Sequence, residues 1–207
     1  AKALALEATL LREAGCLDEA EKRTREILAL DPLDFWALNE LCLVYSARGL
    51  KTEAQKALAD LKMKMRDSVQ SYLELALDYG SSGFWDDAVA VLLRLAGSEN
   101  RQASLNPMIH YYLGYFAGRK GDKQKARQFC LEASQMPADY VFPFRLESIE
   151  VLEWAQKENP QDARAPYYLG NLFFDLQPAR AIKEWERSTT LDGNFALLHR
   201  NLGLAYA

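Results

Sequence analysis

The sequence of 207 residues predicts an all-α fold, an α-solenoid in which antiparallel helix pairs stack one after another. Glycine recurs every 34 residues, at Gly15, Gly49 and Gly83. Alanine recurs with the same interval, at Ala20, Ala54 and Ala88. The composition, 49% hydrophobic and 26% charged, is that of a folded globular chain. A period of 34 residues is typical of a repeat built from two helices, so we expect each repeat to be one helix pair.

Each recurring residue type has a place in such a pair. The glycine is expected to supply the left-handed turn that ends the first helix, helix A. Three residues that also stand 34 apart are then predicted to cap the start of the second helix, helix B: Asp18, Thr52 and Asp86. Small residues such as Gly114 and Gly170 should let neighbouring helices approach closely, and Trp185 should fill the space beside them.

The spacing predicts a single array over residues 1–207, divided into successive units. The expected complete units are 1–34, 35–68, 69–102, 107–140 and 162–194. The wider interval before Gly121 places a four-residue insertion within Ser98–Asn106. Residues 195–207 are expected to form only helix A of a last half-unit.

The register breaks at residues 141–160, which we interpret as a degenerate half-unit with one helix. An irregular entry through Pro143 should precede that helix, because proline can only begin a helix. The aromatic residues Tyr140, Phe142 and Phe144 are expected to plug the gap left by the missing helix, since exposed aromatic clusters of this size are uncommon. The alternative is that the segment is a hinge or a binding insertion.

The motif of the repeat resembles the tetratricopeptide repeat (TPR). Leucine, glycine and a later apolar residue recur in helix A, as Leu113-Gly114 with Ala117, Leu169-Gly170 with Phe173, and Leu202-Gly203 with Tyr206. The resemblance covers nearly the whole chain. It implies a right-handed superhelix that acts as a non-catalytic scaffold and binds a protein or peptide along the concave face formed by helix A.

A second resemblance is narrower and covers the last third of the chain. The runs Phe142-Pro143, Val151–Ala155, Asp162–Asn171 and His199–Leu202 look like the TPR part of large bacterial proteins with a β-rich N-terminal domain. That resemblance implies an alternative role, as an accessory arm of a multidomain carbohydrate-active protein. Any catalysis would then belong to another domain.

Composition and charge exclude several classes of partner. The net charge of −4 gives no basic surface for nucleic acid. The sequence contains no window of 18 consecutive apolar residues, so it predicts no membrane span. The three cysteines, Cys16, Cys42 and Cys130, have no paired spacing, which favours a reducing, cytoplasmic location and predicts neither disulfides nor a zinc site.

No arrangement of residues predicts an enzyme or a cofactor. Nucleotide-binding, nucleophile and zinc-protease motifs are absent from the sequence. Its two histidines, His110 and His199, fall at equivalent helix-A places, where packing is the expected role.

The TPR resemblance implies that ligand contacts come from positions 2, 5, 9 and 12 of each helix A. The partner-binding candidates at these places are Trp36, Asn39, Tyr111, Tyr115, Arg164, Tyr167, Asn171, Phe174 and Arg200. Asn171 is expected to hydrogen-bond an extended backbone, and Arg164 or Arg200 to meet a carboxylate. The alternative is that the tyrosines pack against one another, or against the residues that fill the gap at 141–160. Some chaperone-binding TPR domains hold the C-terminal carboxylate of a peptide with a set of clamp residues. Those residues are missing from this sequence, where Ala5, Thr9, Leu73 and Glu74 stand in their places.

The ends of the sequence suggest two further expectations. The chain begins with Ala1 and ends within an apolar helical pattern, as an excised segment would, so the partner is either another protein or a further domain of the same chain. Leu202, Leu204 and Tyr206 lack a covering helix B in the predicted array. A homodimer through such exposed terminal helices is therefore a third possibility.

Overall fold

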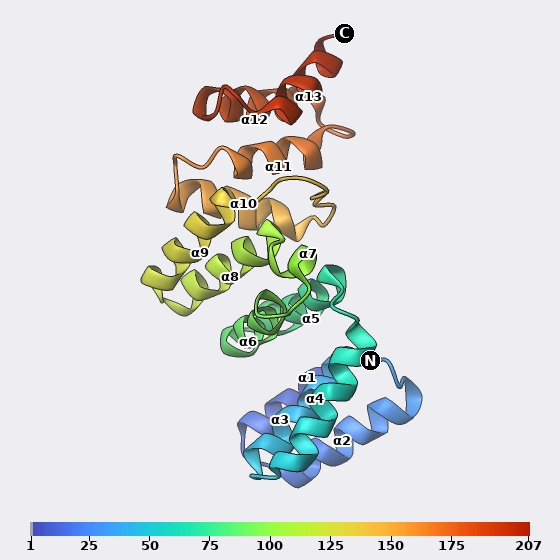
Figure 1. Ribbon diagram of the computed structural model, residues 1–207. Helices are drawn as coiled ribbons and strands as arrows, with labels where there is room; N and C mark the ends of the chain where they lie inside the picture. Colours follow the sequence, from blue (N-terminus) through green and yellow to red (C-terminus); the bar gives the residue numbers. More distant parts are fainter. Residues whose placement is uncertain (1) are drawn as a thin grey trace. The chain divides into compact units, whose positions relative to one another are not determined.

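The computed structural model describes residues 2–207 as a succession of helices (Figure 1). These residues divide into two compact units. The first unit ends at Val91 and the second covers Leu92–Ala207. The single array over 1–207 stays a prediction.

All regular structure within residues 2–207 is helical, which confirms the predicted all-α fold. The first unit contains α1 (Lys2–Glu13), α2 (Leu17–Leu30), α3 (Phe35–Ala47), α4 (Lys51–Met65), α5 (Val69–Ser81) and the start of α6 (Trp85–Ala96). The second unit contains α7 (Arg101–Ser104), α8 (Pro107–Lys120), α9 (Lys123–Gln135), α10 (Glu147–Glu158), α11 (Arg164–Phe173), α12 (Pro178–Leu191) and α13 (Ala196–Tyr206).

Helices that follow one another in the sequence pack together. In the first unit α1 packs on α2 and α3, and α3 packs on α4. In the second unit α8 packs on α9 and α10, α11 packs on α10 and α12, and α12 packs on α13. Contacts between near neighbours in the sequence are characteristic of a solenoid of helix pairs.

Short turns that contain a left-handed glycine end the helix-A elements, as predicted. Gly15, Gly49, Gly83 and Gly121 have φ angles of 78°, 73°, 86° and 96°. The predicted N-caps are wrong by about two residues, because helix B begins directly after the glycine turn. Cys16 and Leu50 hold the N-cap positions of α2 and α4, so Asp18 and Thr52 lie in the first turn instead. Asp86 likewise lies in the first turn of α6.

Two glycines provide the close helix approaches that the repeat motif predicts. A Cβ atom on Gly114 of α8 would lie 2.9 Å from the Sγ of Cys130 in α9. A Cβ atom on Gly170 of α11 would lie 2.8 Å from Cε2 of Trp185 in α12, and closer still to its Nε1. Both distances are shorter than van der Waals contact, so these positions accept only glycine without repacking.

The prediction that aromatic residues plug the gap at 141–160 is wrong. Tyr140, Phe142 and Phe144 expose 86%, 69% and 70% of their surface. The residues before α10 form no helix, and the lone helix α10 fills the space itself. Its Trp154 lies against Gly118 of α8, where a Cβ atom would come within 2.5 Å of Trp154 Cζ2. With that space filled by α10, the three aromatic rings remain at the surface.

Candidate binding surface

In the first unit, the chain's own helix α5 covers the predicted helix-A binding positions. Asn39 is fully buried and its Nδ2 donates to Tyr79 Oη at 2.8 Å. The Trp36 ring lies 5.3 Å from the Tyr79 ring, and its Nε1 donates to Thr9 Oγ1 at 2.9 Å. Trp36 and Asn39 therefore belong to the core, which corrects their prediction as partner-binding residues.

A buried cluster of charged residues also connects helices of the first unit. Arg12 of α1 donates from Nε to Glu40 Oε2 at 2.7 Å and from Nη2 to Asp87 Oδ2 at 2.7 Å. The fully buried Glu40 also accepts from Tyr79 Oη at 2.6 Å. Burial alone would lower the pKa of Arg12, but hydrogen bonds and charges from Glu40 and Asp87 outweigh it and raise that pKa above its ordinary value. The guanidinium thus stays charged and joins α1, α3 and α6.

In the second unit, the candidates on α8 are also engaged internally. Tyr111 is fully buried, and its Oη donates to Asp162 Oδ2 at 2.7 Å, so its prediction as a partner contact is corrected. Burial, followed by the charge of Asp162, raises the pKa of Tyr111 well above 10. Tyr115 donates to Glu150 of α10 at 2.6 Å, and its ring lies 5.8 Å from Trp154. The contacts of Tyr115 favour the alternative in which the tyrosines pack against the residues that fill the gap at 141–160.

Asp162 gives a prediction about stability. Its Oδ1 accepts from the backbone N–H groups of Arg164 and Ala165, at 2.7 and 3.3 Å, in addition to the bond from Tyr111. Asp162→Ala leaves three donors without this acceptor, so we expect a loss of about 1–3 kcal/mol in the free energy of unfolding. Asp162→Asn retains an acceptor oxygen and should cost less. Urea denaturation of both variants tests this, and equal costs would contradict it.

The effect of Asp162→Asn on stability should depend on pH in a defined direction. Burial is the largest influence on Asp162 and raises its pKa above the ordinary value of 3.8. A carboxyl group whose folded pKa is raised contributes stability at low pH and loses it as pH rises through that pKa. The stability of the wild type relative to Asp162→Asn should therefore fall as pH rises above 3.8.

Several remaining candidates line a pocket of about 210 Å³ in the second unit, which we call the α11–α13 pocket. Its lining includes four residues predicted from helix-A spacing: Tyr167, Asn171 and Phe174 from α11 and its C-cap, and Arg200 from α13. It also includes Phe142, Asp175, Trp185, Asn201 and Leu204. Tyr167 and Trp185 are buried and form the base, so Tyr167 is core as well as lining.

Polar groups on the pocket are held in defined positions. Asn171 Oδ1 accepts from Trp185 Nε1 at 3.2 Å and from Asn201 Nδ2 at 3.0 Å, which leaves its own amide N–H groups to donate. Arg200 is exposed and donates only to Asn201 Oδ1, at 3.1 Å. No carboxylate of the described residues pairs with Arg200, so its charge is available to a ligand.

Arg164, another predicted candidate, has a structural role instead. Its Nη2 lies 3.4 Å from Asp192 Oδ2, and its guanidinium carbon lies 3.8 Å from the centre of the Phe195 ring. These contacts tie the start of α11 to the turn before α13. Arg164 does not line the pocket.

Sequence reasoning missed the contribution of Phe142 to this pocket. Helix periodicity places residues of α11 and α13 on a common face, but it does not predict where an irregular segment packs. Phe142 lies in such a segment, 29 residues before Asn171 in the sequence. Leu204 is exposed, and its place beside Arg200 follows from their spacing of four residues on one helix.

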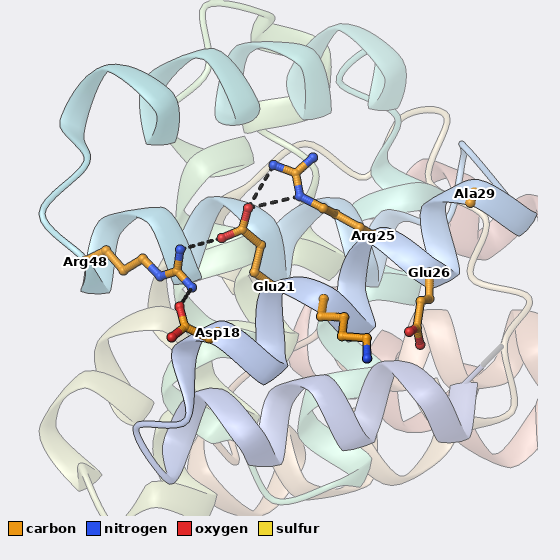
Figure 2. A pocket seen from close by; sticks show the side chains of 7 residues that line it. Asp18, Glu21, Arg25, Glu26, Ala29 and Arg48 are labelled. Carbon is orange, nitrogen blue, oxygen red and sulfur yellow. Dashed lines mark hydrogen bonds and ion pairs between the residues drawn. The ribbon is translucent and has the colours of Figure 1, made fainter.

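A second pocket, of about 530 Å³, lies on α2 of the first unit (Figure 2). Glu21 accepts from Arg25 at 2.8 Å and from Arg48 at 2.5 Å, and Arg48 also pairs with Asp18 at 2.5 Å. The hydrogen bond from Arg25 is the main cause of a lowered pKa at Glu21. The lining has three acidic and three basic residues: Asp18, Glu21, Glu26, Lys22, Arg25 and Arg48. Five of these six side chains pair with charged residues of the chain, and Lys22 is the exception among the lining residues. The acidic and basic residues balance in number, so the pocket as a whole carries no net charge.

The described residues contain little that points to chemistry. Within residues 2–207, no group of three or more His, Cys, Asp or Glu residues is placed to hold a metal ion. Burial raises the pKa of the Cys130 thiol to about 12, so it is not a ready nucleophile. His110 Nδ1 lies 3.1 Å from Glu132, and His199 Nε2 lies 2.7 Å from the Gly193 carbonyl oxygen. None of the helices in this range combines the length and apolar character that crossing a membrane requires.

One comparison with known proteins agrees with the repeat over part of the chain. A family profile described as tetratricopeptide repeat matches residues 73–139. A search of curated proteins found no significant match. Among solved structures, the chain is similar to MamA, with 19% identity over 91% of this chain and 96% of that one and a TM-score of 0.33.

Two other solved structures are similar at the same level. YrrB, described as a TPR protein with an unusual peptide-binding site, is 14% identical over 96% of this chain and 89% of that one, with a TM-score of 0.33. PilF of Pseudomonas aeruginosa is 14% identical over 99% of this chain and 83% of that one, with a TM-score of 0.35. The resemblance to large bacterial multidomain proteins stays a prediction.

Proposed function

We propose that this chain is a non-catalytic interaction module that binds a protein or peptide segment at the α11–α13 pocket. The observation that carries the proposal is the convergence of Asn171, Phe174 and Arg200 with Leu204 around one recess. The tetratricopeptide resemblance over residues 73–139 supports a scaffold role. The partner is either a separate protein or another domain of the same chain.

The pocket offers the features that recognition of a peptide requires. Phe142, Phe174 and Leu204 provide accessible apolar walls around the buried base. The free amide N–H groups of Asn171 can donate to the carbonyl oxygen of a bound backbone. Arg200 can pair with a carboxylate of the ligand, and arginine beside aromatic groups is typical of residues that contribute most to binding.

Internal packing at the other predicted helix-A positions favours the α11–α13 pocket as the binding site. The helix-A residues of the first unit are buried against Tyr79, and Tyr115 of α8 is engaged with Glu150 and Trp154. A ligand at either place would have to displace contacts that stabilise the fold. At the α11–α13 pocket it would cover side chains that are already exposed.

The test begins with selection of binding peptides from a random display library on the wild-type chain. Their affinities for Arg200→Ala and Leu204→Ala are then measured by calorimetry. We expect each variant to weaken binding by about tenfold or more, equivalent to about 1.4 kcal/mol, with little change in stability because both side chains are exposed.

Matched controls come from the same unit. Arg101→Ala and Leu131→Ala remove an exposed arginine and an exposed leucine that do not line the pocket. Both controls should retain the wild-type affinity. Selected peptides that bind all four variants equally would place the binding surface elsewhere and overturn the proposal.

A further inference from the structure

An exposed apolar segment lies immediately before α10. We call its four outward-facing residues, Tyr140, Phe142, Phe144 and Leu146, the aromatic arm; they expose 86%, 69%, 70% and 76% of their surface. The residues between them are covered, since Val141 is buried and Pro143 and Arg145 are partly buried. Alternate residues therefore face opposite sides, and one side of the segment presents three apolar side chains and the ring of Tyr140 to solvent.

The aromatic arm and the α11–α13 pocket form one continuous surface, because Phe142 belongs to both. Leu204 and Phe174, on the pocket, are 69% and 38% exposed. Together with the arm they offer roughly 800 Å² of exposed apolar side chain, taking a large apolar residue as about 150–250 Å². The largest apolar patch on a typical monomer is about 300–600 Å², and a stable interface removes about 800 Å² from each partner.

The shape of this surface matches a second copy of itself. It carries both a projecting element, the aromatic arm, and a recess of about 210 Å³ beside it. That recess is smaller than the roughly 300 Å³ at which pockets for small molecules begin, so it is suited to a single large side chain. A twofold axis can seat a side chain of each arm in the recess of the other copy, because both partners then present the same patch.

The charges on the pocket are also self-complementary. Arg200 has no acidic partner among the described residues, and Asp175 has no basic one. One free cation and one free anion make the pocket neutral, which suits neither a strongly acidic nor a strongly basic partner. In a twofold arrangement each Arg200 can meet Asp175 of the other copy, and both charges are then paired.

We propose that the aromatic arm and the α11–α13 pocket form a symmetric interface between two copies of this chain. An arm side chain of each copy enters the pocket of the other, and two Arg200–Asp175 pairs form across the axis. This inference goes beyond the proposed peptide binding, with which self-association would compete for the pocket.

Sedimentation velocity on the full chain over a range of concentrations tests the proposal. The wild type should approach twice its chain mass of 23.5 kDa as concentration rises. Phe144→Asp, on the arm, should shift the chain to the monomer mass. The matched control Leu131→Asp alters an exposed leucine on α9 of the same unit and should leave the dimer intact. Circular dichroism confirms that each variant keeps its helices.

Charge reversal then tests the arrangement of the two copies. Arg200→Asp and Asp175→Arg each place like charges opposite one another and should each be monomeric. An equal mixture of the two variants restores opposite charges at both contacts, so it should form a heterodimer. A mixture that stays monomeric overturns the proposed arrangement.

The outcomes separate this inference from the proposed function. A wild type that keeps the monomer mass, or a dimer that Phe144→Asp does not weaken, overturns the inference. If such a monomer still binds selected peptides through Arg200 and Leu204, the proposed function stands without the dimer. If the wild type instead forms the dimer but binds no selected peptide, the inference stands and the proposed function is overturned.

Discussion

Arg12→Ala should lower the free energy of unfolding by about 3–5 kcal/mol, as measured by urea denaturation. The reason is that Glu40 is fully buried and depends on the guanidinium of Arg12, at 2.7 Å, for its charge compensation. Removing one partner of a buried ion pair leaves the other charge in a medium of low dielectric constant. Tyr79 also donates to Glu40, but a single neutral hydroxyl group does not replace a full positive charge.

Arg23, an arginine on the neighbouring helix that is more accessible than Arg12, provides the control. Arg23 pairs with Glu7 at 2.9 Å and Glu26 at 2.6 Å, with all three side chains at least one-third exposed. Arg23→Ala should cost at most about 1 kcal/mol, because water screens such pairs. Arg12→Met combined with Glu40→Gln removes both buried charges and should cost less than Arg12→Met alone. If Arg12→Ala costs no more than Arg23→Ala, the cluster does not hold the helices together.

Gly170→Ala should destabilise the chain by about 3 kcal/mol, although alanine is the better helix former. The added Cβ atom would lie 2.8 Å from Cε2 of Trp185 and closer to its Nε1. Trp185 is buried and donates to the Tyr167 carbonyl oxygen at 3.3 Å, so it cannot simply turn aside. The cost lies between that of an overpacked core, about 1–3 kcal/mol, and that of losing a buried tryptophan, about 3–5 kcal/mol.

The glycine at the matching place of the next helix A gives the opposite expectation. Gly203 lies within α13, and a Cβ atom there meets nothing within 4 Å. Gly203→Ala should therefore raise stability by up to about 1 kcal/mol through helix propensity alone. A similar loss at both glycines, measured by urea denaturation, would show that propensity and not contact with Trp185 governs the effect.

The repeat made much of the fold predictable. The glycine interval locates Gly15, Gly49 and Gly83 at the ends of helices because the left-handed conformation they need follows from local geometry. The helix starts were less predictable, since Cys16 and Leu50 are poor caps by side-chain chemistry. In these two places the short turn decides where the helix begins, and no hydrogen bond from an N-cap side chain is needed.

The binding surface was less predictable than the fold. Helix spacing shows which residues share the helix-A face, but it does not show what packs against that face. Trp36, Asn39 and Tyr111 are on the predicted face and are buried by later parts of the chain, through Tyr79 and Asp162. Such long-range contacts have no counterpart in a local pattern, whereas Asn171 and Arg200 keep polar groups that line an open pocket.

The link between Asn171 and Asn201 has a consequence for the energetics of recognition. Three of the nine lining residues, Arg200, Asn201 and Leu204, belong to α13. The main packing partner of α13 is α12, and its contact with α11 includes this amide hydrogen bond of 3.0 Å. A helix held by few neighbours opens locally at a lower free energy than the body of the unit. Any ligand that spans α11 and α13 must select the closed form of α13, so its observed affinity includes the equilibrium between open and closed helix.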